Sequence, residues 1–276
     1  MNLRKVQVAC EFASLPESLV QEAARFCHPQ QQGGTLSLWE PQPPPPLPPS
    51  SEDAVACLWA AVCLGSSDAP SLLTLAGAAA AAAPQALKPS DAVSALWACS
   101  MVEALKCAPA VVHALYSAVE RCMGELTPAQ AHSVLLAHFS GLPASPALFA
   151  ACWAHRAALP PAPLTPAQSD VSRALEELGL TVSHGVPILD GLLTVDIAAT
   201  PPCSYQKIAV VVDGPSAFLR SPLDGGRALL HAAPAAQRLR LIQENFGPTL
   251  LIPFYEFTES AEDLRENLAA KLDMML

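Results

Sequence analysis

A repeat of 38 to 39 residues is the feature that most constrains the fold of this 276-residue chain. The segments SEDAVACLWAA, PSDAVSALWAC and PAQAHSVLLAH begin at positions 51, 89 and 128, and LTPAQ at 126–130 recurs at 164–168. We expect each segment to form a helix whose buried side carries Leu58-Trp59, Leu96-Trp97 or Leu135-Leu136. A fixed period of this length is typical of helical repeat proteins, in which each unit buries its apolar face against the next.

A second helix is predicted inside each unit. Pro70, Pro109 and Pro146 open the apolar stretches that follow the three segments. Proline suits the first turn of a helix, where its missing N–H would have had no partner. The sequence therefore predicts an α-solenoid of helix pairs over residues 51–164. Residues 1–50 are predicted to hold a degenerate helical segment and the proline-rich linker EPQPPPPLPPS.

After residue 164 the pattern changes from helical periodicity to short apolar runs. A helix is predicted over 166–179, a second from about Gly225 to Phe246 and a third over 259–276. Strands are predicted over 180–186, 192–199, 207–214 and 249–255. The continuous apolar run IAVVV at 208–212 is typical of a central strand that is buried on both faces. The predicted fold is mainly α, with a small C-terminal α/β domain over residues 165–276.

Composition excludes several classes of protein. Hydrophobic residues make up 51% of the chain, but no uninterrupted apolar run is long enough to predict a membrane span. The nine cysteines form no CxxC pair, and the histidines have no metal-ligand spacing with them, so we expect reduced thiols and no metal. No glycine-rich phosphate loop or other cofactor motif is present, and no cofactor is predicted.

Three blocks in the C-terminal region resemble a known family. VDIAA, IAVVVDGPSAF and RLRLIQENFGPTLLIPFYEF are similar to the RAP domain, a module attached to helical repeats in organelle RNA-metabolism proteins. The residues that carry the resemblance are Asp196, Asp213, Gly214, Pro215 and Tyr255. The 38-residue units are similar to the octotricopeptide repeats of algal organelle proteins.

Together, these resemblances imply an RNA-binding factor in a chloroplast or the mitochondrial matrix. Its role would be RNA processing, transcript stability, translation or ribosome assembly. No transit peptide is evident in the N-terminal residues, and Glu11 and Glu17 do not suit one. Whether the chain lacks a targeting segment, is cytosolic or is a piece of a longer repeat array stays open.

The RAP resemblance also implies a restriction-endonuclease-like fold, so a Mg²⁺-dependent ribonuclease is an alternative. Such nucleases hold the metal between two carboxylates on adjacent strands. Here Asp196 and Asp213 are the candidates, but Val211 stands where the family has a glutamate, and Ala217 where it has a histidine. A non-catalytic role is therefore favoured. In a purely structural reading, Asp213 shapes the turn with Gly214, and Asp196 pairs with Arg238 or Arg240 to hold a helix to the sheet.

The charge distribution separates the two predicted domains. The chain has a net charge of −10, and residues 51–164 carry four basic side chains against seven acidic ones. This helical region is a poor surface for a phosphate backbone. The predicted RNA contacts lie instead in the basic segment of the C-terminal domain: Lys207, Arg220, Arg227, Arg238 and Arg240. The other class of function left open is a structural scaffold or ribosome-associated protein that binds other proteins.

Overall fold

The computed structural model describes residues 50–65, 69–82, 87–156, 163–202, 204–220, 229–257 and 260–275. They belong to two compact units, Met1–Arg156 and Ala157–Leu276. The first unit is helical in its described part, and a small mixed sheet lies in the second, so the mainly α fold with a C-terminal α/β part is confirmed. The predicted helical segment and linker of residues 1–49 lie outside the described residues.

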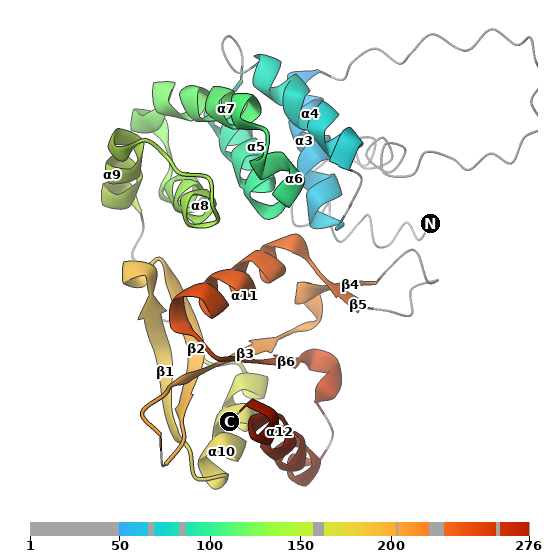
Figure 1. Ribbon diagram of the computed structural model, residues 1–276, viewed down its shortest axis with the longest axis vertical. Helices are drawn as coiled ribbons and strands as arrows, with labels where there is room; N and C mark the ends of the chain where they lie inside the picture. The colour runs from blue at the N-terminus through green and yellow to red at the C-terminus, as the bar shows by residue number, and fades with distance from the viewer. Residues whose placement is uncertain are drawn as a thin grey trace, which may run out of the picture. The chain divides into compact units, whose positions relative to one another are not determined.

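The first unit consists of paired helices (Figure 1). α3 packs against α4, α5 against α7 and α8 against α9, while α3, α5 and α8 also pack on one another in that order. The short helix α6 and the 3-10 turn η1 (Met123–Glu125) complete the unit. The helix bounds are α3 Ser51–Cys63, α4 Ala69–Ala82, α5 Pro89–Met101, α6 Glu103–Lys106, α7 Pro109–Arg121, α8 Pro128–Phe139 and α9 Pro146–His155.

Helix starts and buried leucines follow the sequence pattern, but the tryptophans do not. Pro109 and Pro146 open α7 and α9 as predicted. Leu58, Leu96 and Leu135 are fully buried as predicted, whereas Leu136 is half-buried. Trp59 and Trp97 were also expected on the buried side of their helices, and this prediction is wrong. Both indoles are half-buried and line a groove between helices. Consecutive helix positions differ by about 100°, so the residue after a core leucine lies at the edge of the apolar face.

The second unit contains a four-stranded sheet of order β1-β2-β3-β6. β1, β2 and β3 pair antiparallel, whereas β3 and β6 pair parallel. A separate two-stranded sheet is formed by β4 and β5. The bounds are α10 Pro166–Glu177, β1 Thr181–Ile188, β2 Leu193–Thr200, β3 Ile208–Asp213, β4 Phe218–Arg220, β5 Leu229–His231, α11 Ala233–Phe246, β6 Thr249–Pro253 and α12 Ala261–Met275.

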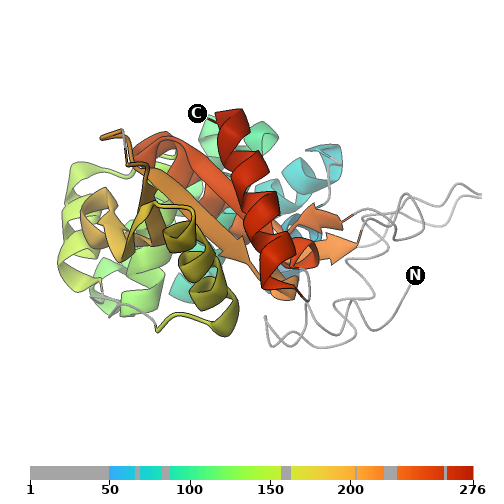
Figure 2. The ribbon, with the colours of Figure 1, turned by 90° about the horizontal axis from the view of Figure 1, so that it is seen from below.

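Helices cover both faces of the four-stranded sheet. Figures 1 and 2 show α10 and α12 side by side on one face, and α11 lies on the other. Val210 belongs to the core under α10 and α12, and Val211 to the core under α11. This two-sided burial explains the continuous apolar run of β3, which is an interior strand as predicted.

Two sequence expectations for this unit need correction. The helix predicted from Gly225 begins at Ala233, because the chain first forms β5, which pairs with β4; neither strand was predicted. β6 ends at Pro253, and Phe254–Glu256 forms a 3-10 turn, η4, instead of continuing the strand. A strand of three residues has too little periodicity to be distinguished from a loop.

The second copy of LTPAQ belongs to the second unit. Thr127 and Thr165 each cap the following helix, with the hydroxyl accepting from the N–H of Gln130 or Gln168 at 3.3 and 3.2 Å. Each glutamine side chain accepts in return from the threonine N–H at 2.8 Å. The repeated letters therefore encode the same capping box. The second copy begins α10, which packs on α12 and the sheet, so it does not open a fourth helix pair.

Candidate nucleic-acid interface

Most of the residues that resemble the RAP signature meet at one edge of the sheet. The parallel strands β3 and β6 end together, with Asp213 paired to Pro253 in register. Gly214 and Pro215 follow Asp213 and begin the 3-10 turn η3 (Pro215–Ala217), while Tyr255 follows β6 in η4. β4 and β5 extend from the same edge, and the backbone N–H of Ala232 donates to the carbonyl of Ala217 at 2.8 Å.

Four rings form a cluster at this edge. Phe218 lies 4.6 Å from His231, 5.6 Å from Phe254 and 5.5 Å from Tyr255, measured between ring centroids. Phe254 and Tyr255 are 5.5 Å apart and nearly perpendicular, at 79°. Tyr255 is 54% exposed, whereas the other three rings are half-buried. The buried rings hold the backbone of Tyr255 in place and leave its ring accessible for stacking.

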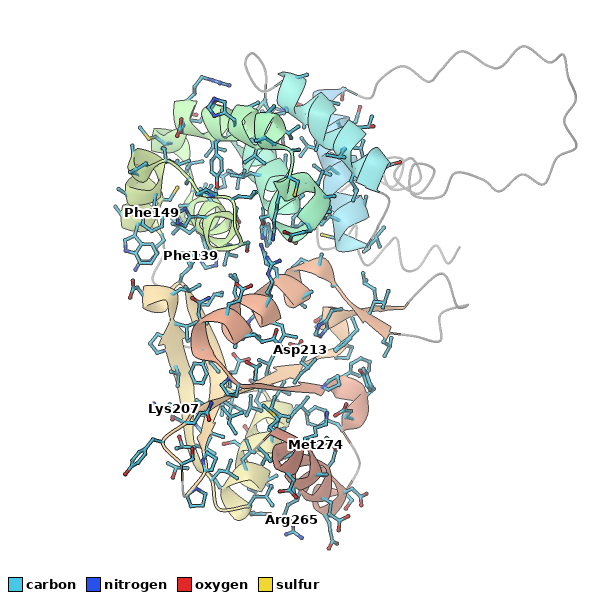
Figure 3. The ribbon with its side chains drawn as sticks, in the orientation of Figure 1. Phe139, Phe149, Lys207, Asp213, Arg265 and Met274 are labelled. Atoms are coloured by element: carbon cyan, nitrogen blue, oxygen red, sulfur yellow. The ribbon has the colours of Figure 1, made fainter. Side chains whose placement is uncertain are left out.

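Asp213 is buried at the centre of this edge (Figure 3). Its Oδ2 lies 3.1 Å from Nε2 of His231. The two atoms lack the alignment of a hydrogen bond, so the contact is mainly electrostatic. Burial raises the pKa of the Asp213 carboxyl, His231 and Arg238 act to lower it, and the neighbouring Asp196 carboxylate raises it further. The carboxylate is therefore partly compensated by basic side chains.

Asp196 is held by α11. Its Oδ2 accepts from Nη2 of Arg238 at 3.0 Å, and the same nitrogen donates to the carbonyl of Thr194 at 3.2 Å. This contact confirms the predicted pairing of Asp196 with Arg238. Asp196 and Asp213 interact electrostatically, so the structure brings the two predicted nuclease carboxylates to the same region. Val211, where the RAP resemblance would place a glutamate, is 1% exposed and lies in the core under α11.

The predicted RNA contacts do not form one surface. Lys207 is exposed but precedes β3, at the opposite end of the six-residue strand from Asp213, about 20 Å away at 3.3 Å per residue (Figure 3). Arg238 is engaged by Asp196, and Nε of Arg240 lies 3.8 Å from Glu244. Arg220 ends β4, but its side chain and the whole of Arg227 lie outside the described residues. Arg220 and Leu229, the paired residues on either side of the connection that carries Arg227, lie two residues further along β4 and β5 from Phe218 and His231 of the ring cluster.

Sequence reasoning missed His231 and Phe254. His231 comes from β5, directly opposite Phe218 in the two-stranded sheet. No local pattern around 229–231 predicts a strand, so only the pairing with β4 reveals this position. Phe254 was assigned to a strand, where alternation would have separated it from Tyr255.

Among the described residues, no group of three or more His, Cys, Asp or Glu side chains is placed to hold a metal ion. None of the described helices is long and apolar enough to cross a membrane. No protein-family model matches the chain, and no curated protein matches it.

Proposed function

We propose that the second unit binds single-stranded RNA at the edge where β3 and β6 end, and that it does so without chemistry of its own. The observation that carries this proposal is the exposed ring of Tyr255, held on a cluster of half-buried rings. Exposed aromatic rings stack on unpaired bases, and each stack contributes about 1–3 kcal/mol of binding free energy. The arginines near the β4–β5 connection, Arg220 and Arg227, are the proposed phosphate contacts.

The ion pairs at the same edge support a non-catalytic role. A nuclease of this type needs two carboxylates free to bind Mg²⁺. Asp196 is occupied by Arg238 at 3.0 Å, and Asp213 faces His231 at 3.1 Å. Binding a metal here would require displacing basic side chains. Because the two carboxylates are nevertheless neighbours, a Mg²⁺-dependent ribonuclease is retained as the weaker alternative.

The first unit supports a wider assignment. Its helix pairs, with α3, α5 and α8 packed in sequence, are what a short α-solenoid requires. We assign it as an octotricopeptide-like array and the second unit as a RAP domain with a restriction-endonuclease-like fold. On this assignment the chain is an organelle RNA-binding factor, in a chloroplast or mitochondrion, that acts in RNA processing, stability or translation. Its RNA would be an organelle transcript or ribosomal RNA.

RNA binding is testable with a matched pair of tyrosine variants. Tyr255 and Tyr205 are both exposed, but Tyr205 precedes β3 and lies at the opposite end of the parallel strands. The dissociation constant of a fluorescein-labelled 12-nucleotide single-stranded RNA of mixed sequence is measured by anisotropy for the full chain. We expect Tyr255→Ala to weaken binding about tenfold, since one stacked base is lost. Tyr205→Ala should change it less than twofold.

Two further measurements define the proposal. Replacing Arg220 and Arg227 together by alanine should weaken binding and reduce its dependence on salt, because phosphate contacts release counterions. An affinity that is independent of salt would overturn RNA binding by this route. Incubating the RNA with the chain and Mg²⁺, then resolving it on a denaturing gel, tests the nuclease alternative. Cleavage that is abolished by Asp196→Ala would replace the non-catalytic proposal.

A second candidate function is a structural scaffold, including a ribosome-associated protein. The acidic first unit favours it, because a surface with carboxylates and half-buried tryptophans suits basic proteins better than phosphates. This candidate predicts a stoichiometric protein complex and weak affinity for free RNA. Size-exclusion chromatography of the complex, with and without ribonuclease, separates the two candidates.

A further inference from the structure

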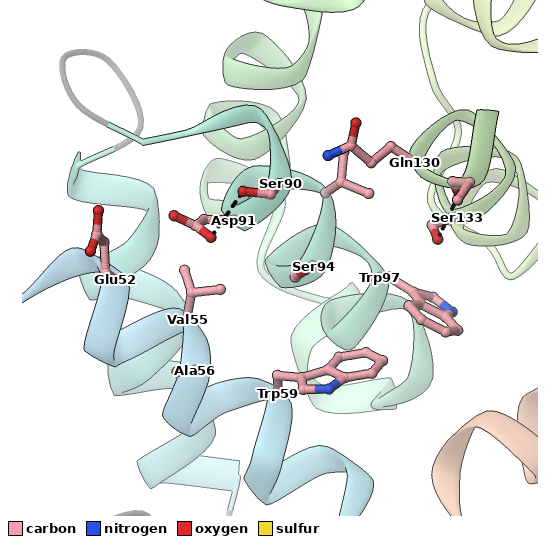
Figure 4. A pocket seen from close by; sticks show the side chains of 12 residues that line it. Glu52, Val55, Ala56, Trp59, Ser90, Asp91, Ser94, Trp97, Gln130 and Ser133 are labelled. Carbon is pink, nitrogen blue, oxygen red and sulfur yellow. Dashed lines mark hydrogen bonds between the residues drawn. The ribbon is translucent and has the colours of Figure 1, made fainter. Parts of the chain in front are cut away.

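A groove of about 380 Å³ lies between the first helices of the three helix pairs, α3, α5 and α8 (Figure 4). Its lining repeats with the sequence period. Ala56, Ser94 and Ser133 are equivalent positions, and all three line the groove, as do the equivalent Trp59 and Trp97. Neighbouring packed helices lie about 8–10 Å apart, so equivalent positions on successive helices are separated by about that distance. About three residues of an extended peptide span the same distance.

The groove combines aromatic rings with carboxylates. The centroids of Trp59 and Trp97 are 4.7 Å apart, and both indoles are half-buried, so each ring retains exposed surface. The indoles lie at one end of the groove, and Glu52 and Asp91 line the other end. Among the described residues, no lysine or arginine lines the groove. Lys88 reaches Glu52 at 2.7 Å, but both side chains are more than half exposed. Such a surface pair is weak, and a bound cation can replace it.

A guanidinium already binds an indole elsewhere in this unit. The guanidinium carbon of Arg156 lies 3.6 Å from the ring centroid of Trp153. Cation–π contacts of this kind favour arginine and tryptophan over other pairs. In the groove, the two indoles lie at one end and Asp91 at the other, and no lysine or arginine is among the described side chains that line it. The described lining therefore combines an aromatic face with carboxylates and contains no cation of its own.

We propose that this groove binds an extended, arginine-bearing peptide segment of a partner protein. One guanidinium lies against Trp59 or Trp97, and a second arginine of the same segment lies toward Asp91 at the other end of the groove. An RNA strand is the less favoured occupant, because its phosphates would face Glu52 and Asp91 with no cation in the lining to offset the repulsion. The proposal does not depend on RNA binding by the second unit, which concerns different residues.

A positive charge introduced into the groove should repel an arginine-bearing peptide, and this repulsion tests the proposal. Ser94 lines the groove between the carboxylates and the indoles, whereas Ala110 is an exposed position on α7 outside the lining. A lysine at either position changes the net charge equally. The probe is a fluorescein-labelled (Gly-Arg)₆ peptide, with a (Gly-Glu)₆ peptide and a 12-nucleotide single-stranded RNA as comparisons. Binding to the full chain is measured by anisotropy, and folding of each variant is checked by circular dichroism.

We expect Ser94→Lys to weaken binding of the arginine peptide at least about fivefold, and Ala110→Lys less than twofold. Asp91→Asn should also weaken it, whereas Glu125→Gln, an exposed acid outside the lining, should not. Trp97→Leu should lower the affinity about fivefold through loss of the cation–π contact. Equal losses for the paired lysine variants, or no binding of the arginine peptide, would overturn the proposal. Tighter RNA binding by Ser94→Lys together with weaker RNA binding by Trp97→Leu would assign the groove to RNA instead.

Discussion

Carboxylates in the two units differ in what surrounds them. In the groove of the first unit, Lys88 pairs with Glu52 on an exposed surface and also interacts electrostatically with Asp91, and no lysine or arginine is among the described side chains that line the groove. In the second unit, Asp196 and Asp213 are each contacted by a basic side chain from a neighbouring element. An acidic residue in a groove or at a strand end is therefore not by itself evidence of a binding site. Their partners decide whether a charge is available to a ligand or used within the fold.

The largest predicted effect on stability concerns the buried Asp213 of the second unit. His231→Ala removes the ring that packs on Phe218 and leaves the Asp213 carboxyl without its nearest basic side chain. We expect the free energy of unfolding of the second unit to fall by about 2–3 kcal/mol. Urea unfolding followed by circular dichroism measures it. All four tryptophans lie at or before position 153, so tryptophan fluorescence reports the first unit and serves as the internal control.

A smaller loss is expected at the ion pair that holds α11 to the sheet. Arg238→Ala leaves the half-buried Asp196 without its partner and removes the bond to the carbonyl of Thr194. The expected loss is about 1–2 kcal/mol. Arg173→Ala is the matched control, because Arg173 pairs with Asp170 at 2.9 Å on an exposed helix face of the same unit. That variant should lose about 0.5 kcal/mol or less. Equal losses would show that Asp196 does not depend on Arg238.

The two copies of LTPAQ allow a comparison of identical local structures in different units. Thr127→Ala and Thr165→Ala each remove the side-chain half of a capping box, which typically costs about 1 kcal/mol. Hydrogen exchange of the first turns of α8 and α10 should increase by the same factor in the two variants. Different factors would indicate that tertiary contacts, rather than the local capping bonds, hold one of the two starts.

The smallest predicted effect is a change with pH. Because the pKa of Asp213 is raised in the folded protein, its carboxyl contributes stability below its ordinary value of 3.8, and this contribution is lost as pH rises through the raised pKa. Asp213→Asn keeps a neutral side chain at every pH. The variant should therefore gain stability relative to the unchanged chain as pH increases from 3 to 6, with His231, Arg238 and Asp196 present in both. A relative loss over this interval would contradict the raised pKa.

Much of the fold was predictable because local chemistry encodes it. Prolines and capping boxes set the helix starts, and the uninterrupted run of β3 indicated a strand covered on both faces. Helix starts and the buried strand depend on neighbours in sequence or on strong, simple patterns. Asp196 was expected to pair with Arg238 or Arg240 in the structural interpretation, and it pairs with Arg238.

Features that depend on distant contacts were not predictable. β4 and β5 are too short to show alternation, and they exist because they pair with each other. Trp59 and Trp97 follow core leucines in sequence, but the packing of α3 against α5 places both indoles at the groove. His231 entered the candidate site for the same reason. Sequence patterns identified the elements, whereas the ring cluster and the groove arise from how those elements pack.

The central claim is that RNA binds the sheet edge of the second unit, and one set of titrations tests it most directly. The dissociation constant of the labelled single-stranded RNA is measured in parallel for the unchanged chain, Tyr255→Ala and Ser94→Lys. We expect a loss of about tenfold for Tyr255→Ala and no more than a twofold change for Ser94→Lys. Unchanged binding by Tyr255→Ala, together with tighter binding by Ser94→Lys, would contradict it and place the RNA in the groove of the first unit.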